Sequence, residues 1–512
     1  MKYIAWLLSF TVGFLSMAQE ILWIRVSGFA LETLPQGFAF VLAMFLMGIS
    51  LGALIGKSVC TRYKNLILIA GWVLLVAGLL DLSLIFCIPF LFTSFYAAGL
   101  GLLIFISASI KGIIFPIAHH IGSTIDVKLG RSVSVVYFMN IMGSTLGPLV
   151  VGLFLLNTLT ITASFQLLAI SVLSFSALLL LFIFASQRNI YTLAGVLIVS
   201  LFTYQAVLSF DSKDHQLVAG LVKVDKIFLK SVIENRHGII HTLKGEKEGD
   251  DIVYGGNVYD GRTNIDLRVN SNKVDRAYLL HILHKKPGRV LVIGLSTGAW
   301  TRILLTNPDI KKLDIVEINP GYIELIKSYP QLSPILEDSR VTLHIDDGRR
   351  WLRRHPQLKY DLIVMNTTFH WRANVTNLLS KEMLTLTGSH LNAGGVFTFN
   401  TTDSMDAFFT ASQIFPYAYK YRNFIYVSDH DFRNAVNQEK FQLFKLKLAD
   451  KAVFDATNKQ DNDAISAMLN IPFKNIDEVK ATSHRTLEVI TDQNMIPEYK
   501  YGKRLFGSRQ NL

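Results

Sequence analysis

Seven long apolar segments in the first 210 residues constrain the fold of this chain more than any other feature. They lie at about 3–24, 34–56, 65–88, 94–118, 133–156, 161–185 and 190–210. A helix needs about 20 consecutive apolar residues to cross a bilayer, and each segment is near that length. The first segment lacks a small-x-small cleavage site, so we interpret it as a retained span. The sequence therefore predicts a multi-pass α-helical membrane domain of about seven helices over residues 1–210.

The composition of the chain changes sharply near residue 211. Overall, 51% of the residues are hydrophobic and 17% are charged, below the quarter that is typical of globular proteins. Charges are few before residue 211, whereas the later residues have the composition of a soluble domain. Both cysteines, Cys60 and Cys87, lie in the apolar part, which excludes a disulfide framework or a cysteine metal site after residue 211.

The net charge of +11 is spread over both parts of the chain. It forms no basic stripe with interleaved aromatic residues, so nucleic acid is not an expected partner. A basic balance on a membrane protein more often reflects anionic lipid nearby. We therefore expect the lipid bilayer and a small-molecule substrate as partners.

The charges in the short loops predict the orientation of the spans. Three alternate loops carry a basic excess, from Lys57, Arg62 and Lys64, from Lys128 and Arg131 against Asp126, and from Arg188. The loops between them, near 89–93 and 157–160, are uncharged. Basic loops stay in the cytoplasm, so the N-terminus is expected there. An odd number of spans then places everything after residue 211 on the periplasmic side of a cell membrane.

Several polar residues lie inside the apolar segments, among them Glu20, Lys111 and Asn140. Ionisable groups at membrane depth are costly and usually face a partner or a cavity. We expect Glu20 and Lys111 to pair between the first and fourth segments. This pair would fix the order of the helices, and the alternative is a substrate or ion path. The small residues Gly48, Gly52 and Gly56 predict one smooth helix face for close packing.

The residues after 211 divide by pattern into three regions. Residues 211–288 read as an amphipathic connector followed by a small antiparallel β-subdomain, with a hairpin signal at Asp260-Gly261. Over residues 289–430, apolar runs at 290–293, 313–318, 341–345, 362–365 and 396–400 alternate with helical stretches. That alternation is typical of a Rossmann-like parallel sheet, with the ligand at the carboxyl ends of its strands. Residues 431–512 form a C-terminal extension without a recognisable motif.

Polar residues and glycines follow the first three strands of this sheet. Gly294 and Gly298 allow the backbone to approach a ligand closely. A carboxylate at Glu317 can hold both hydroxyls of a ribose. Asp346 and Asp347 are placed to accept from an adenine amino group or to hold a neighbouring backbone. Together they predict a site for an adenosyl-type ligand, and the alternative is that these acids are ordinary solvated loop residues.

These motifs resemble the spermidine synthase (polyamine aminopropyltransferase) family, in particular bacterial members fused to a polytopic membrane domain. The similar stretches are Val290-Leu-Val-Ile-Gly-Leu-Ser-Thr-Gly298, Val316-Glu-Ile-Asn-Pro320, Asp346-Asp-Gly348, Tyr360-Asp-Leu-Ile-Val-Met-Asn366 and Leu391-Asn-Ala-Gly-Gly-Val396. The resemblance implies a bacterial inner-membrane protein with a nucleoside ligand, either decarboxylated S-adenosylmethionine or methylthioadenosine.

The chain departs from this family at the positions that recognise polyamines. The resemblance implies transfer of an aminopropyl group to a diamine, with an acidic residue accepting the amine's proton. Asn366 stands at that catalytic position, and an amide cannot act as a general base at neutral pH. Ser296 and Thr297 replace the stretch of the glycine loop whose aspartate binds the donor's amine. The family's Tyr-His-Glu triplet appears as Tyr278-Leu-Leu280.

The loop at 366–377 offers other polar groups where family substrates enter. His370 is a second candidate catalytic residue, because a histidine can act as a base near pH 7. Arg372 would repel a polyamine and attract a carboxylate or a phosphate. The alternative is that Trp371 packs against the sheet while His370 and Arg372 are solvated.

Three functions remain open from the sequence. The first is a membrane-bound spermidine synthase-like transferase with an altered acceptor. The second is a catalytically degenerate domain that binds a ligand or serves as a scaffold, which accounts for Asn366. The third is a transporter with a regulatory soluble domain, motivated by Glu20 and Lys111.

Overall fold

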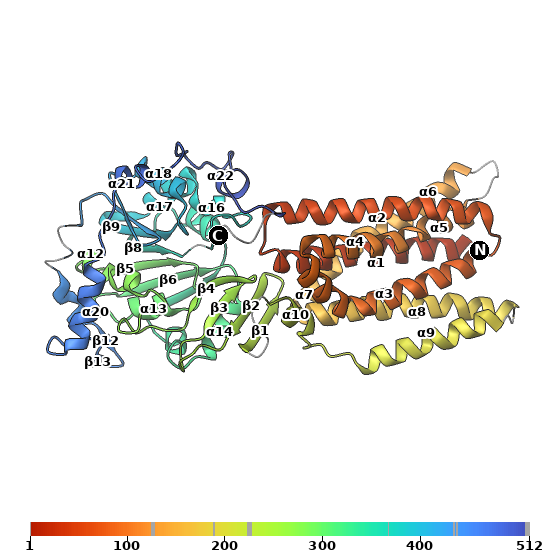
Figure 1. Ribbon diagram of the computed structural model, residues 1–512, viewed down its shortest axis with the longest axis horizontal. Coiled ribbons are helices and arrows are strands. Elements are labelled where there is room, and N and C mark those ends of the chain that lie inside the picture. Colours follow the sequence, from red (N-terminus) through yellow and green to blue (C-terminus); the bar gives the residue numbers. More distant parts are fainter. Residues whose placement is uncertain are drawn as a thin grey trace. The chain divides into compact units, whose positions relative to one another are not determined.

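The computed structural model describes residues 2–123, 129–187, 190–222, 228–366, 368–433, 436 and 439–506. The chain divides into two compact units, a helical unit of residues 1–227 with 234–236 and 505–512, and an α/β unit of residues 228–233 and 237–504 (Figure 1). Of the loop residues that predicted the orientation, Asp126, Lys128 and Arg188 lie outside the described residues.

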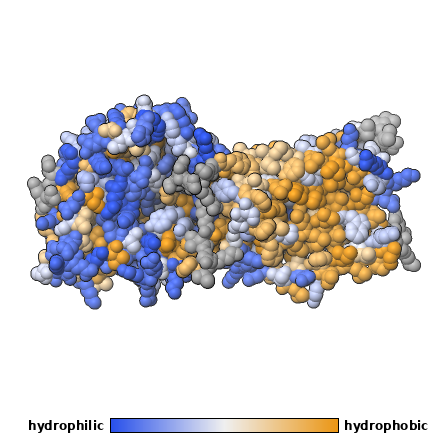
Figure 2. All heavy atoms as spheres, in the orientation of Figure 1, coloured by the Kyte–Doolittle hydropathy of each residue, from blue (hydrophilic) through white to orange (hydrophobic). Residues whose placement is uncertain are grey.

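The helical unit confirms the predicted helices. Its long helices are α1 (Lys2–Ala30), α2 (Pro35–Arg62), α3 (Leu66–Phe95), α4 (Ala97–Gly112) with α5 (Ile114–Gly122), α6 (Leu129–Val150) with η1 (Val151–Leu155) and α7 (Leu156–Thr158), α8 (Ile161–Gln187) and α9 (Ile190–Leu208). A short helix, α10 (Gln216–Leu221), follows. Within the described residues, seven helices are long and apolar enough to cross a membrane. The face of these helices drawn in Figure 2 is mostly hydrophobic.

The three glycines of α2 pack against α4 and α5. A side chain at Gly48 would bring its Cβ to 2.5 Å from the carbonyl oxygen of Phe105, and one at Gly56 to 2.5 Å from that of Ile113. A Cβ at Gly52 would collide with the backbone of Ser109. The predicted smooth helix face is therefore confirmed, because only glycine lets these backbones approach so closely.

The buried lysine of α4 has a different partner from the one expected. Lys111 Nζ lies 2.7 Å from Asp81 Oδ2 of α3, and it also donates to the side-chain oxygen of Gln19. Gln19 Nε2 in turn donates to Asp81 Oδ1 at 2.8 Å. The prediction of a Glu20–Lys111 pair is wrong, because neighbouring helix residues point about 100° apart and Gln19 is the one that faces this cluster. The cluster links α1, α3 and α4.

The α/β unit begins with a four-stranded antiparallel sheet in the order β1-β2-β3-β4. Its strands are β1 (Leu229–Asn235), β2 (Gly238–Leu243), β3 (Ile252–Gly255) and β4 (Val258–Arg262). This sheet is the predicted β-subdomain. The short helices α11 (Asp275–Tyr278) and α12 (Leu280–Leu283) lead from it to the larger sheet.

The larger sheet has seven strands in the order β10-β11-β9-β8-β5-β6-β7 (Figure 1). Its strands are β5 (Arg289–Ile293), β6 (Lys312–Glu317), β7 (Val341–Ile345), β8 (Tyr360–Met365), β9 (Leu391–Asn400), β10 (Tyr417–Tyr421) and β11 (Phe424–Ser428). The five strands from β9 to β7 are parallel, β11 pairs antiparallel with β9, and β10 pairs antiparallel with β11. The strand order reverses between β5 and β8, which is where such sheets bind ligands.

Helices cover both faces of this sheet, as a parallel sheet requires. The helices are α13 (Ala299–Leu304), α14 (Gly321–Lys327), α15 (Gly348–Arg354), α16 (Thr376–Leu379), α17 (Lys381–Gly388) and α18 (Met405–Ser412). Alternate residues of β5 enter two separate cores: Val290 and Val292 lie in one, and Leu291 and Ile293 in the other. The predicted Rossmann-like arrangement is confirmed.

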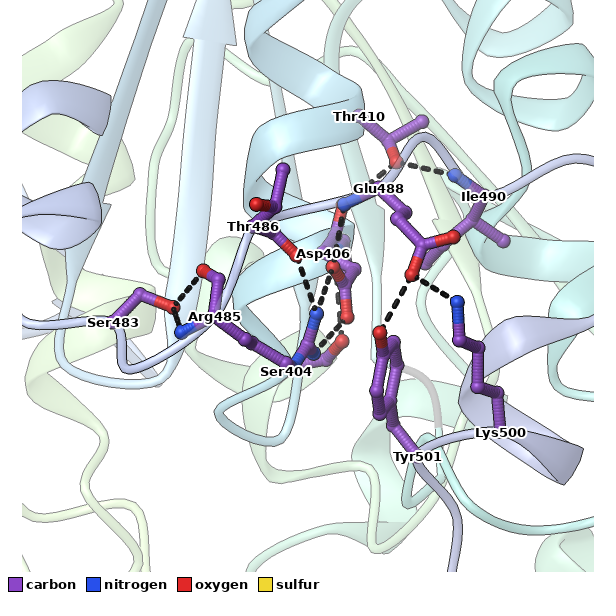
Figure 3. A network of polar contacts seen from close by, with 11 residues as sticks. Ser404, Asp406, Thr410, Ser483, Arg485, Thr486, Glu488, Ile490, Lys500 and Tyr501 are labelled. Atoms are coloured by element: carbon purple, nitrogen blue, oxygen red, sulfur yellow. Dashed lines mark hydrogen bonds and ion pairs between the residues drawn. The ribbon is translucent and has the colours of Figure 1, made fainter.

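The residues after 438 pack against both cores. Ile465 of α20 (Lys459–Leu469) belongs to one core, and Ile490 and Ile496 to the other. Asp406 of α18 holds this segment through the guanidinium of Arg485, whose Nη1 donates to Oδ1 at 2.9 Å (Figure 3). The C-terminal region is therefore part of the α/β unit's packing.

Candidate functional site

A loop with left-handed backbone joins β5 to α13. Gly294 and Gly298 have φ angles of 85° and 80°, which glycine adopts without strain. A Cβ at Gly294 would lie 3.0 Å from the carbonyl oxygen of Asn366, and one at Gly298 would lie 2.7 Å from Ile326. Ser296 also has a positive φ of 50°. The two glycines therefore let this glycine loop (residues 294–298) lie against the end of β8 and the helix α14.

Glu317 holds the glycine loop from the end of β6. Its Oε2 accepts from the backbone amide of Leu295 and its Oε1 from that of Asn319, both at 2.7 Å. Burial raises the pKa of this carboxyl to about 7, although the backbone amides oppose the rise. A carboxylate has about four acceptor sites, and the amide of Ser296 also acts on this group, so its backbone contacts leave a ribose few of them. The ribose contact stays a prediction, and the structure adds a role in shaping the loop.

Asp346 and Asp347 are engaged at the start of α15. Asp346 Oδ1 accepts from the amide of Asp347 at 2.7 Å and from Arg350 Nε at 2.5 Å. Burial raises the pKa of Asp346, but its hydrogen bonds with Arg350 and Asp347 outweigh that effect and hold the pKa below its usual value. Asp347 Oδ1 caps the helix by accepting from the amide of Arg350 at 2.7 Å. Both acids thus hold the neighbouring backbone, one of the two roles expected of them.

A cavity of about 400 Å³ adjoins the glycine loop. Its lining comes from the loop itself, from the ends of β8 and β9 at Asn366 and Asn400, and from Asp260 of β4. It therefore opens at the switch point between β5 and β8. Glu317, Asp346 and Asp347 do not line this cavity, although the charge of Asp260 acts on Glu317.

Asn366 lines the cavity, and its side chain is the first of three amides joined by hydrogen bonds. Its Oδ1 accepts from Asn400 Nδ2 at 3.3 Å, and Asn400 Oδ1 accepts from Asn423 Nδ2 at 2.8 Å. Asn423 Oδ1 accepts in turn from Arg276 Nη1 at 2.9 Å. The position that carries an acid in the resembled family is thus occupied by an amide tied to an arginine.

His370 does not line the cavity. Its backbone amide donates to Thr402 Oγ1 at 2.9 Å, and its Nδ1 lies 2.9 Å from the same oxygen. Burial lowers the pKa of this histidine, with a smaller opposing effect from the backbone of Thr402. The structure therefore brings Asn366 to the cavity and leaves the second candidate catalytic residue beside it.

Trp371 and Arg372, the next two residues of this loop, are both less exposed than expected for residues in a solvated loop. Trp371 is buried, as expected for a residue that packs against the sheet. Arg372 is partly buried and donates from Nη1 to Thr368 Oγ1 at 2.7 Å. Burial lowers the pKa of Arg372, against the opposing influence of Tyr322 and Asp260.

Two groups in the cavity wall were not singled out by the sequence. Asp260 Oδ2 accepts from the phenol of Tyr322 at 2.5 Å, and burial raises the pKa of Asp260 to about 6. Arg276 lies 5.3 Å from the ring centre of Trp300 and 4.8 Å from that of Phe424. In the sequence, Asp260 stood out as a turn residue and within Tyr259-Asp-Gly261, a stretch that also resembles the family, without a role in the site, and Arg276 belongs to no motif. In contrast, Tyr278 of the altered triplet is buried in the core.

In the part of the chain that the structure describes, no group of three or more His, Cys, Asp or Glu residues is placed to hold a metal ion. The polar groups that line the cavity are instead amides, hydroxyl groups, two carboxyl groups and two basic side chains. Such groups suit the orientation of an organic ligand.

The sheet order and the glycine loop at the switch point place this half of the chain in the Rossmann-like class of α/β proteins. Residues 277–414 match the family described as the spermine/spermidine synthase domain. The chain therefore contains a spermidine synthase-like domain over these residues.

Curated relatives match over part of their length. A polyamine aminopropyltransferase of Streptococcus uberis is 35% identical over 101 residues, which cover 19% of this chain and 35% of the relative. That of Alkaliphilus oremlandii is 31% identical over 160 residues, or 30% of this chain and 49% of the relative. The chain thus spans between about a third and a half of the length of these two relatives.

Two solved structures are also similar. A spermidine synthase in complex with the transition state analogue AdoDATO is 18% identical, with a TM-score of 0.41 over 49% of this chain and 87% of that chain. The spermidine synthase of Thermotoga maritima is 18% identical, with a TM-score of 0.40 over 49% of this chain and 86% of that chain.

Proposed function

We propose that this chain is a multi-pass membrane protein whose α/β unit binds an adenosyl-type ligand and acts as an aminopropyltransferase-class enzyme on an acceptor other than a simple diamine. The observation that carries the proposal is the cavity beside the glycine loop, at the switch point of the sheet. The names of the matched relatives, polyamine aminopropyltransferases, supply the reaction class.

Asp260 is the residue that we assign to proton transfer. It lines the cavity, and burial raises the pKa of its carboxyl to about 6, so it can accept a proton near neutral pH. The acceptor's nitrogen would bond to the carbon next to the donor's sulfonium as the carbon–sulfur bond breaks. Asp260 would take the proton that the nitrogen releases, and a thioether nucleoside would leave. Glu317 would position the nucleoside by holding the glycine loop.

A second candidate is a ligand-binding protein without catalysis. Asn366 favours it, because the cavity wall has an amide where the resembled family has its proton acceptor. Methylthioadenosine binding without turnover of decarboxylated S-adenosylmethionine, across a panel of amines, would support this candidate over the transferase.

The membrane location rests on the seven long apolar helices. The charges of the loops favour a periplasmic α/β unit, which would separate it from a donor made in the cytoplasm. Reporter fusions after Lys213 and at the C-terminus test this orientation. A cytoplasmic reporter signal at both sites is the result that the transferase function requires, and a periplasmic signal would favour the binding function.

Calorimetry on the detergent-solubilised full chain tests the ligand. We expect methylthioadenosine to bind in the micromolar range and aminopropyl transfer to yield methylthioadenosine from decarboxylated S-adenosylmethionine. Absence of binding by every adenosyl compound at millimolar concentration would overturn the proposed function.

A further inference from the structure

Arg276 brings a positive charge to the cavity wall without a carboxylate to balance it. Its guanidinium donates to the carbonyl oxygens of Lys273 and Asn272 and to Asn423 Oδ1, at 2.8–2.9 Å, and all three are neutral acceptors. No carboxylate of the described residues lies within 4.0 Å of its guanidinium nitrogens. A largely buried cation normally has an anionic partner, because its desolvation is otherwise uncompensated. The missing partner is what a ligand can supply.

The guanidinium is also held rigidly and keeps donors to spare. It lies over the rings of Trp300 and Phe424, whose centroids are 4.6 Å apart. Arg276 has five N–H groups, and the three recorded hydrogen bonds use three of them. Two N–H groups therefore remain for an acceptor in the cavity. A planar arginine fixed in this way is suited to a carboxylate.

The acidic groups nearby are occupied elsewhere. Asp275 precedes Arg276 but pairs with Arg422, whose Nε lies 2.6 Å from its Oδ2. Asp403 lines the cavity and pairs with Lys420 at 3.1 Å. Asp403 is therefore engaged away from Arg276, and Asp275, whose charge still acts on Arg276, is shared with Arg422.

The charged residues that line the cavity are Asp260, Asp403, Lys273 and Arg276. Asp260 accepts from Tyr322 and lies under the electrostatic influence of Arg372. Lys273 adds a second positive charge to the lining, on an exposed side chain. Lys273 and Arg276, three residues apart in the chain, are therefore the two positive charges of the lining.

The side-chain amide of Asn366 can offer an N–H donor to a ligand in the cavity. Because Asn366 Oδ1 accepts from Asn400, the polar atom left without a recorded partner in the described part of the chain is the donor Nδ2. A cationic amine needs acceptors in this position, whereas a carboxylate needs donors. Asn366 and Arg276 thus favour the same kind of group.

We propose that the cavity holds the carboxylate of a bound ligand, with Arg276 as its charged partner. The inference rests on the proposed adenosyl site and deepens it by naming the chemical class of the ligand. The carboxylate has two possible sources. The acceptor is the source that agrees with aminopropyl transfer, whereas a carboxylate on the amino-acid end of the adenosyl compound would keep the adenosyl site and replace decarboxylated S-adenosylmethionine as its ligand. A fully decarboxylated pair of substrates would instead place an ammonium group against a guanidinium, which is unfavourable in a cavity of low dielectric.

Two matched ligand pairs distinguish the sources by calorimetry on the full chain. S-adenosylhomocysteine carries an amino-acid end that methylthioadenosine lacks. If the adenosyl compound supplies the carboxylate, S-adenosylhomocysteine binds at least tenfold more tightly than methylthioadenosine. With methylthioadenosine saturating, 4-aminobutyrate is compared with putrescine. If the acceptor supplies the carboxylate, 4-aminobutyrate binds at least tenfold more tightly than putrescine.

The variant Arg276→Gln ties either preference to this residue. We expect it to remove the tenfold advantage of the carboxylate ligand while methylthioadenosine binding changes less than twofold. Arg276→Lys should keep part of the preference. Arg433→Gln is the matched control, because Arg433 pairs with Asp431 outside the cavity. The thermal unfolding temperature of each variant reports whether it is folded.

The outcomes separate this inference from the proposed function. If both nucleosides bind with equal affinity and 4-aminobutyrate shows no advantage over putrescine, the carboxylate site is overturned while the adenosyl site stands. A preference that survives in a folded Arg276→Gln variant also overturns it. If no adenosyl compound binds at all, the proposed function fails and this inference fails with it.

Discussion

Glu317 Oε2 accepts a hydrogen bond from the backbone amide of Leu295 at 2.7 Å, so the end of β6 clamps the loop that follows β5. We expect Glu317→Ala to weaken methylthioadenosine binding at least tenfold, because the glycine loop loses this support and the ribose loses its proposed acceptor. Calorimetry measures the change. Glu324→Ala on the exposed side of α14 is the control and should bind normally. Unchanged binding in Glu317→Ala would remove Glu317 from the ligand site.

The buried carboxyl of Glu317 also predicts a pH dependence of stability. Burial raises its pKa from 4.5 to about 7, so between these values the folded protein keeps a proton that the unfolded chain releases. The contribution of Glu317 to stability therefore falls as pH rises through this window, by about 3 kcal/mol at most.

Thermal unfolding of wild type and Glu317→Gln at pH 5 and pH 8 measures this effect. The wild-type unfolding temperature should fall by several degrees relative to the variant between the two pH values. The titration of Asp260 is present in both proteins and largely cancels. A constant difference between them would show that Glu317 does not titrate in this range.

The substitution Asn366→Asp should change which charge the cavity accepts. An aspartate can still accept from Asn400, but it adds a negative charge to the cavity wall. We expect weaker binding of S-adenosylhomocysteine, by about fivefold, and a gain in the binding of decarboxylated S-adenosylmethionine. Asn65→Asp, at the start of α3 in the helical unit, should change neither affinity. Aminopropyl transfer to putrescine by Asn366→Asp would show that the missing acid is the main reason for lost activity on diamines. If no transfer is measured, a further residue is needed for that activity.

The Lys111–Asp81 pair predicts strong coupling between two substitutions. Lys111→Met or Asp81→Leu alone leaves a buried charge without its partner and should destabilise the protein by about 3–5 kcal/mol. The double variant should cost less than either single one, because both charges are gone. Thermal unfolding in detergent micelles measures all three, with Lys57→Met on the exposed face of α2 as the control. Additive effects of the two substitutions would contradict the pairing.

Asp406 should control the attachment of the C-terminal segment (Figure 3). It is buried and accepts from Arg485 and from the backbone amide of Glu488, both at 2.9 Å. We expect Asp406→Asn to cost about 2–3 kcal/mol and to expose the chain after Ser483 to trypsin. Asp477→Asn, with an 84% exposed carboxylate, should leave both unchanged. Equal protease resistance of the two variants would argue that packing of Ile490 and Ile496 holds the segment by itself.

Local pattern determined the elements of this protein. The seven apolar helices and the alternation of strands and helices were predictable, because the periodicity of a helix or a strand depends on residues close together in the sequence. The glycines were predictable for the same reason: Gly48, Gly52 and Gly56 share one helix face, and Gly294 and Gly298 bracket one turn. The amide at Asn366 was also visible, since its strand could be aligned with a family motif.

Contacts between distant residues were decided only by the tertiary structure. Lys111 could have paired with either acid by composition, and the rotation of α1 and α3 selected Asp81 over Glu20. Arg276 belongs to no motif, yet the hydrogen bond from Tyr426 of β11 to its carbonyl oxygen and its own bond to Asn423 hold it at the cavity wall. The sequence correctly placed Glu317, Asp346 and Asp347 at strand ends. Which of their carboxylate oxygens accept hydrogen bonds from backbone amides depends on the path of the adjoining loops. Sequence periodicity specifies which face of a helix or strand a residue occupies. The residue that it contacts depends on how the faces of different elements pack together.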